Sequence, residues 1–283
     1  MTRNILAIFA LLISQQSAAA FSTMVLDDCE AAWQKAMSGS ASHVTHKISD
    51  DGWCQVIDNA EIAIDKIEWR ATNLDRLLKD SLAPTALEIR VTDTDILQVF
   101  GEGGKQDAPA MPMQITLSLR ENADEHQVIL ERLEFIGPKD NWVLLKGVFH
   151  DVNLSSMATM QVSVGSAKLR DITLTATGNR MLRPYIEPYI GDTFPERSRW
   201  RSTAMGKVMD WPDNSFPAAT KDAVKKLIAV LPAPNGTLDA TVDTGAGISL
   251  AIFMQSFLFG KSSEELLDGI LKTTVFHAKW TSH

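Results

Sequence analysis

The stretch Met113-Gln-Ile-Thr-Leu-Ser-Leu119 alternates strictly between apolar and polar side chains. Four further runs with strand-like composition or the same alternation follow it, at 128–135, 142–149, 158–164 and 172–176. A period of two is typical of a strand with one buried face and one wet face. Five such strands joined by short polar connections predict an antiparallel meander.

Working outward from the meander, the sequence predicts both strands and helices. Shorter strand-like runs lie at 43–49, 53–57, 61–70, 87–91, 237–242 and 273–280. Apolar stripes with helical spacing predict helices at 28–37, 74–82, 217–231 and 263–272. The fold class expected is α+β, a mainly antiparallel β-sheet in meander order with amphipathic helices packed on one face.

The N-terminus has the order of a secretory signal peptide. Arg3 precedes the uncharged apolar run Ile5–Ile13, and small residues at Ala18 and Ala20 follow. The alternative is a membrane anchor, but nine apolar residues are fewer than the roughly 20 needed to span a bilayer. We therefore expect residues 1–20 to be removed and the protein to be periplasmic, soluble after cleavage.

Residues 21–283 are expected to form one β-rich domain, with subdomains at 21–177 and 178–283. Without Arg3 this part has 26 basic and 35 acidic residues, a net charge of −9. Such an acidic balance argues against nucleic-acid binding, which needs a basic surface.

Cys29 and Cys54 are the only cysteines. An even count in an exported protein predicts a disulfide between them. The alternative is a reactive pair, but the Cys-x-x-Cys spacing typical of redox motifs is absent.

The sequence offers little for catalysis. His43, His46, Asp50 and Asp51 lie close in sequence, but His residues three apart in a strand point to opposite faces, so no metal site is expected. No hydrolase, metalloprotease, P-loop or dinucleotide motif occurs, so no catalytic residue and no cofactor are predicted.

Two segments are candidates for binding. Arginines and aromatics are interleaved around Arg197, Arg199, Trp200 and Arg201, a combination suited to an anionic head group or an acidic partner. The alternative is pairing with the chain's own acidic surplus. The segment Ile248–Phe259, which contains Phe257, is either buried core or part of an apolar groove.

Several stretches resemble those of known envelope proteins. They are a strand ending in Trp69, the helix 74–82 followed by Pro84-Thr85, the strand 87–91, and Leu231-Pro-Ala-Pro-Asn-Gly-Thr-Leu238. They resemble uncharacterised periplasmic proteins of Gram-negative bacteria and, distantly, the AsmA-like envelope proteins. The latter resemblance implies a long amphipathic sheet with an apolar lipid groove, although AsmA-like proteins are far longer and keep a membrane anchor. No site residues can be carried over.

These features favour a non-enzymatic periplasmic binding or envelope-assembly protein that holds a lipid or an envelope protein on a sheet groove. Leu117 would lie on the groove floor, Phe257 would supply further apolar surface, and the arginine segment would form the rim. The alternative is an envelope hydrolase with unrecognised catalytic residues. The sequence does not define the oligomeric state.

The signal peptide leads to the first prediction. Protein recovered from the periplasm should begin at Phe21, because the small side chains of Ala18 and Ala20 fit the cleavage pattern of signal peptidase. N-terminal sequencing checks this, and exported protein that still began at Met1 would contradict it.

Overall fold

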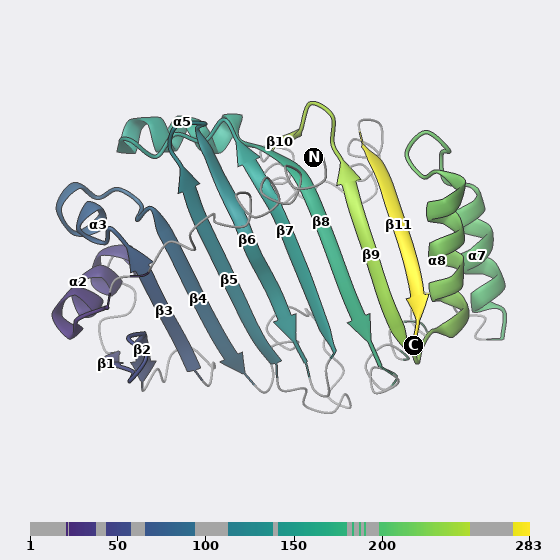
Figure 1. The fold of residues 1–283 in the computed structure, drawn as a ribbon, viewed down its shortest axis with the longest axis horizontal. Coiled ribbons are helices and arrows are strands. Elements are labelled where there is room, and N and C mark those ends of the chain that lie inside the picture. Colours follow the sequence, from purple (N-terminus) through teal and green to yellow (C-terminus); the bar gives the residue numbers. More distant parts are fainter. Residues whose placement is uncertain are drawn as a thin grey trace, which may run out of the picture.

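The computed structural model describes residues 21, 23–37, 44–57, 66–93, 113–137, 141–179, 183, 187, 190, 198–249 and 274–283. The strands within these residues form one open sheet of eleven strands, and every pairing is antiparallel (Figure 1). Strands β1 to β9 are neighbours in chain order, β11 follows β9, and the short β10 pairs with β8. The expectation of a mainly antiparallel α+β meander is confirmed.

The strands are β1 (Thr45–Ile48), β2 (Cys54–Ile57), β3 (Lys66–Thr72), β4 (Ala86–Asp93), β5 (Met113–Asn122), β6 (Gln127–Ile136), β7 (Trp142–His150), β8 (Lys168–Gly178), β9 (Gly236–Asp243), β10 (Ile248–Ser249) and β11 (Val275–Ser282). The helices are α2 (Leu26–Met37), α3 (Asp75–Asp80), α5 (Met157–Ser166), α7 (Trp200–Met209) and α8 (Ala218–Val230). The predicted helix 263–272 and most of the segment Ile248–Phe259 lie outside the described residues.

One predicted strand is wrong. The run 158–164 alternates apolar and polar side chains, yet the structure has helix α5 there. Ser156 caps this helix, because its side chain accepts a hydrogen bond from the Thr159 N–H while the Thr159 hydroxyl accepts one from the Ser156 N–H. Such a capping box satisfies two free donors of the first turn, which the alternation pattern does not take into account.

Strand β6 contains an irregularity. The apolar positions of this segment change parity between Leu130 and Leu133. The pairing of β6 with both β5 and β7 shifts at this point, so an extra residue is inserted into β6. Such a bulge brings Leu130 and Leu133 to the same face of the sheet.

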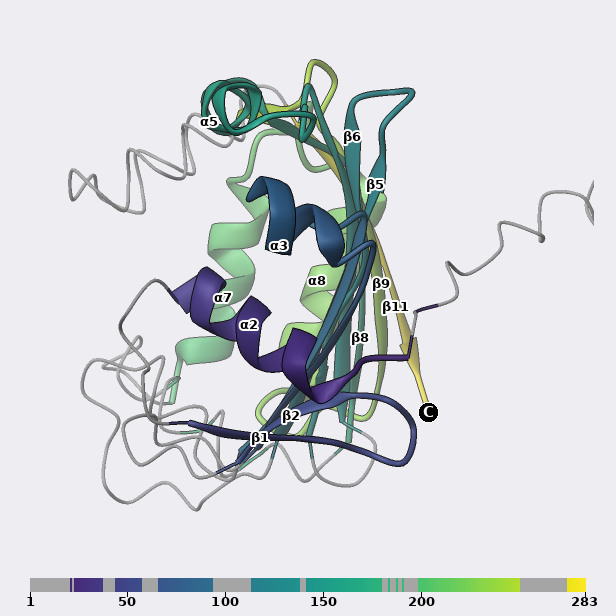
Figure 2. The ribbon, with the colours of Figure 1, turned by 90° about the vertical axis from the view of Figure 1, so that its left-hand side faces the viewer.

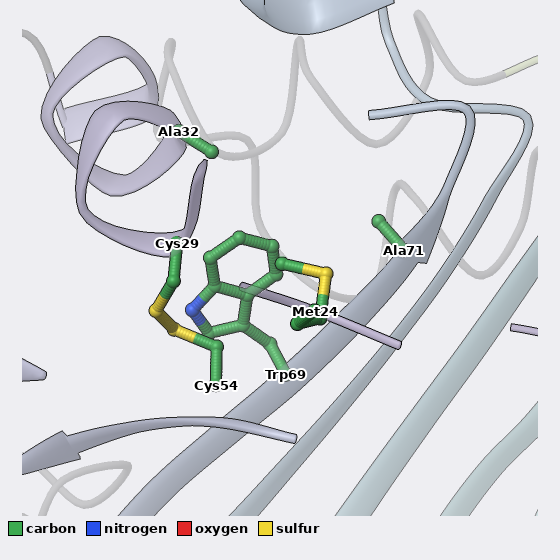
Figure 3. Packing of buried hydrophobic residues seen from close by; sticks show 6 residues of the cluster. All are labelled: Met24, Cys29, Ala32, Cys54, Trp69 and Ala71. Atoms are coloured by element: carbon green, nitrogen blue, oxygen red, sulfur yellow. A yellow bond between two sulfur atoms is a disulfide. The ribbon is translucent and has the colours of Figure 1, made fainter. Parts of the chain in front are cut away.

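The first core lies at the β1 end of the sheet. Cys29 of α2 is bonded to Cys54 of β2, as expected, with Cα atoms 5.9 Å apart. Trp69 packs beside this disulfide, together with the other buried residues Met24, Ala32 and Ala71 (Figure 3). Leucines of the α3 region pack against the same cluster. The disulfide thus ties α2 to the outermost hairpin of the sheet.

The second core lies at the β11 end. It is built from Trp200 and Val208 of α7 and Ile228 of α8. Next to it, the ring of Phe216 stacks on Phe276 of β11 with centroids 4.8 Å apart. Helices α2, α3, α7 and α8 all lie on the same side of the sheet (Figure 2).

Helix α8 also protects the edge of β11. The buried Thr220 hydroxyl donates a hydrogen bond to the Phe276 carbonyl (2.6 Å) and accepts one from the Ala278 N–H (3.1 Å). The Phe276 N–H donates to the Ser215 carbonyl at 2.8 Å. These bonds occupy backbone groups of an edge strand that would otherwise be open to pairing with another chain.

Thr220→Val should therefore lower the free energy of unfolding by about 1–3 kcal/mol, because the isosteric change leaves buried backbone groups of β11 without partners. Urea denaturation followed by circular dichroism measures this. Thr281→Val, at an exposed position of the same strand, is the control and should stay within about 0.5 kcal/mol. Equal stability of the two variants would contradict the role given to Thr220.

Candidate functional site: the apolar face of the sheet

Strand register aligns apolar side chains in rows across the sheet. Residues directly opposite each other in an antiparallel pair share one face. The central row runs through eight strands in succession: Trp69, Ile89, Leu117, Leu133, Leu145, Leu174, Ala240 and Ala278. A continuous apolar row therefore crosses the sheet from β3 to β11.

A second row lies two residues away along each strand. It consists of Ile67, Val91, Ile115, Phe135, Val143, Ala176, Leu238 and Trp280. On the other side of the central row, Ala71, Leu87, Leu119, Leu130 and Gly147 form a third row from β3 to β7. We refer to these three rows as the apolar face.

The apolar face is less buried than expected for a core. In the central strands β5 to β8, its side chains are mostly half-buried, and Val143 is 37% exposed. On the opposite face of β5, in contrast, Thr116 is only 2% and Ser118 only 7% exposed. A closed core would have the reverse distribution, with apolar side chains more buried than polar ones.

The opposite face is covered by its own charged side chains. Glu68 forms ion pairs with Lys66 (2.8 Å) and Arg90 (3.5 Å), and Arg70 donates to Glu88 at 2.9 Å. The guanidinium groups of Arg70 and Arg90 each lie 4.3 Å from a ring centroid of the buried Trp53. Most of these charged groups are thus paired within the face, and the buried Arg90 Nε is an exception without a hydrogen-bond partner.

The sequence-predicted binding residues lie in different parts of the fold. Leu117 is the third of the eight residues in the central apolar row. Arg199, Trp200 and Arg201 lie at the start of α7, beyond β11 at the end of the sheet (Figure 1). Arg197 and Phe257 lie outside the described residues. The structure does not bring Leu117 next to the arginines, since four strands separate β5 from β11.

Two of these predicted residues have contacts within the protein. The buried Trp200 belongs to the second core. Arg201 lies over the Trp200 ring, 4.9 Å from its centroid, and donates a hydrogen bond to the Leu231 carbonyl. Arg199 and Arg201 remain exposed beside the second core.

Two hollows are lined entirely by described residues. One, of about 380 Å³, lies over strands β8, β9 and β11, and its polar side chains Thr175, Asp239 and Lys279 lie on the charged face by register. The other, of about 460 Å³, lies against α5, where Val162 is 73% exposed. The lining of the first hollow also includes Leu174, Ala240 and Ala278 of the central apolar row, whereas the second is lined by no residue of the apolar face.

Three titratable groups in the described part have displaced pKa values. Burial lowers the pKa of His46, whereas hydrogen bonds from Ser49 and Lys225 lower the pKa of the exposed Asp51 and Asp222, respectively. Each shift favours the form that already dominates at neutral pH, so none creates an acid or base poised for proton transfer there.

Sequence reasoning missed most of the residues of the apolar face. Leu133, Leu145 and Leu174 join Leu117 only because of long-range register. The alternation in each strand was visible, but the alignment between strands was not. It also missed the proximity of His46 to Cys29 and Cys54, which come from three different elements.

Comparisons with protein-family models, curated proteins and solved structures give no match for this chain. Among the described residues, no helix is both long and apolar enough to cross a membrane.

Proposed function

We propose that this is a non-enzymatic periplasmic binding or envelope-assembly protein that holds the acyl chain of a lipid on the apolar face of its sheet. The observation that carries the proposal is the distribution of burial in the central strands. There, most apolar side chains remain half-buried, whereas Thr116 and Ser118 on the other face of β5 are buried.

The size of the apolar face fits a lipid chain. From β4 to β9 there are five strand spacings, or about 24 Å at 4.8 Å each. Across this width the central and second rows cover about 7 Å along a strand, and the third row adds about 7 Å from β4 to β7. The total area is about 270 Å², close to the roughly 300–600 Å² of the largest apolar patch on a typical protein, which is often functional. An acyl chain lying across the strands would contact one side chain of the central row on each strand.

The helices fit a groove with closed ends. In the proposal, α2 and α3 pack on the apolar face at the β3 end, and α7 and α8 pack on it at the β11 end. Supporting this, Trp69 and Ala71 of the apolar face belong to the first core, and Phe276 stacks beside the second. Strands β5 to β8 would then be the floor.

Charge gives the orientation of the ligand. The exposed Arg199 and Arg201 lie at the β11 end, where they would attract an anionic head group while the acyl chain extends toward β5. No specific observation favours the alternative of a hydrolase, because the groups with displaced pKa values are not poised for proton transfer.

Binding of the acyl chain to the apolar face is tested by substituting two neighbouring residues of β8. Leu174 lies in the central apolar row, and Thr173 next to it is exposed on the opposite face. Leu174→Asp should weaken binding of a fluorescent fatty acyl probe at least about tenfold, since a carboxylate on the floor opposes an apolar ligand. Thr173→Asp adds the same charge to the other face and should leave affinity unchanged. Leu117→Asp should behave as Leu174→Asp does.

Circular dichroism must show that all three variants are folded. Absence of saturable binding by the unmodified protein would remove the lipid site. Equal affinity of the Leu174 and Thr173 variants would place the site elsewhere on the molecule.

The proposed role of Arg199 and Arg201 is tested by removing their positive charges. Replacing Arg199 and Arg201 with Ser should weaken binding of an anionic acyl probe and reduce its salt dependence, because screened attraction to the head group is lost. Binding of a neutral acyl probe should not change. Unchanged affinity and salt dependence for the anionic probe would assign these arginines to an ordinary solvated surface.

A further inference from the structure

Three potential metal ligands meet in the first core. The sulfur atoms of Cys29 and Cys54 and a ring nitrogen of His46 all lie within 4.8 Å of one another. The cysteines are fully buried, and His46 is 5% exposed. His46 and Cys54 share a face of the β1–β2 hairpin, while Cys29 is brought over them by α2.

His46 has an unused ligand atom. Its Nε2 is buried and has no hydrogen-bond partner, a costly state for a polar group. Trp33 packs edge-on against the ring, with centroids 5.6 Å apart, and so limits its orientation.

A second buried donor faces the sulfur atoms. The Trp69 Nε1 is also buried without a partner, and Figure 3 shows the nitrogen side of this indole turned toward the two sulfurs. A disulfide is a weak acceptor, whereas a metal-bound thiolate accepts hydrogen bonds readily. The surroundings of the cysteines therefore suit thiolates as well as a disulfide.

We propose that Cys29, Cys54 and His46 form a Cu(I) site when the disulfide is reduced. Two soft thiolates and one imidazole suit Cu(I). Structural zinc almost always has four ligands, and within the described residues no fourth His, Cys, Asp or Glu joins this group. The complete burial of both sulfurs also leaves little access for a water ligand.

A dithiol reductant can convert the Cys29–Cys54 disulfide into the two thiols that the site needs. The reductant becomes a disulfide, and its two electrons and two protons pass to the sulfurs, giving the thiols of Cys29 and Cys54. Cu(I) then binds both sulfurs and the His46 nitrogen, and the two thiol protons are released to solvent. The same two residues thus form either a covalent bond or a metal site.

The test uses the mature chain without oxygen, with and without prior reduction. Cu(I) is added in competition with the chromogenic chelator bicinchoninate. We expect one Cu(I) per reduced chain and none on the disulfide form. His46→Asn should weaken binding at least about tenfold, because losing a ligand costs no less than losing an outer-shell partner. His126→Asn, an exposed histidine in the β5–β6 turn, is the matched control and should bind like the unmodified chain.

Several results would overturn the site. These are equal binding by the reduced and disulfide forms, equal affinity of the two histidine variants, or tighter binding of Zn²⁺ than of Cu(I). X-ray absorption of the loaded protein should show two sulfur ligands and one nitrogen ligand. If the reduced chain unfolds, one equivalent of Cu(I) should restore its circular dichroism spectrum, and failure to do so would equally refute the proposal.

Discussion

The rest of the structure depends on one constraint: successive side chains of each strand must alternate correctly between the two faces of the sheet. Side chains alternate between faces, so one residue added to or removed from a strand would move its apolar set to the wrong side. The bulge in β6 and the register shift between β7 and β8 occur where the sequence alternation itself is broken. These irregularities keep the apolar rows on one face across the sheet.

Because one face is apolar throughout, the protein stabilises its two faces by different means. On strands β3 and β4, the charged face is stabilised by ion pairs and by arginines stacked on Trp53. In the function proposed, the apolar face is packed against helices at the two ends of the sheet, which is supported by Trp69 and Ala71 in the first core and by Phe276 stacked on Phe216 beside the second. The central strands keep their apolar side chains half-buried, which is the basis of the function proposed.

The two ends differ in how they can respond to their surroundings. The α7–α8 end is held by packing and by the Thr220 hydroxyl on the edge of β11. The α2 end is held by a disulfide, and Trp33, His46 and Trp69 around it each have a buried ring nitrogen without a hydrogen-bond partner. If the proposed Cu(I) site forms there, the chemistry of this end would depend on reductant and metal. A change there would act on β2 and β3, which begin the row that runs into the central strands.

The sequence by itself determined four of the five strands predicted for the meander, the partner of each cysteine and the approximate limits of α8. These depend on local alternation, on proline positions and on there being only two cysteines. Only the tertiary structure decided that 157–166 is a helix, where a local cap outweighs the alternation pattern. It also decided which side chains share a row, and that His46 lies beside both cysteines. Register and packing join residues far apart in the chain, and no local pattern encodes those distances.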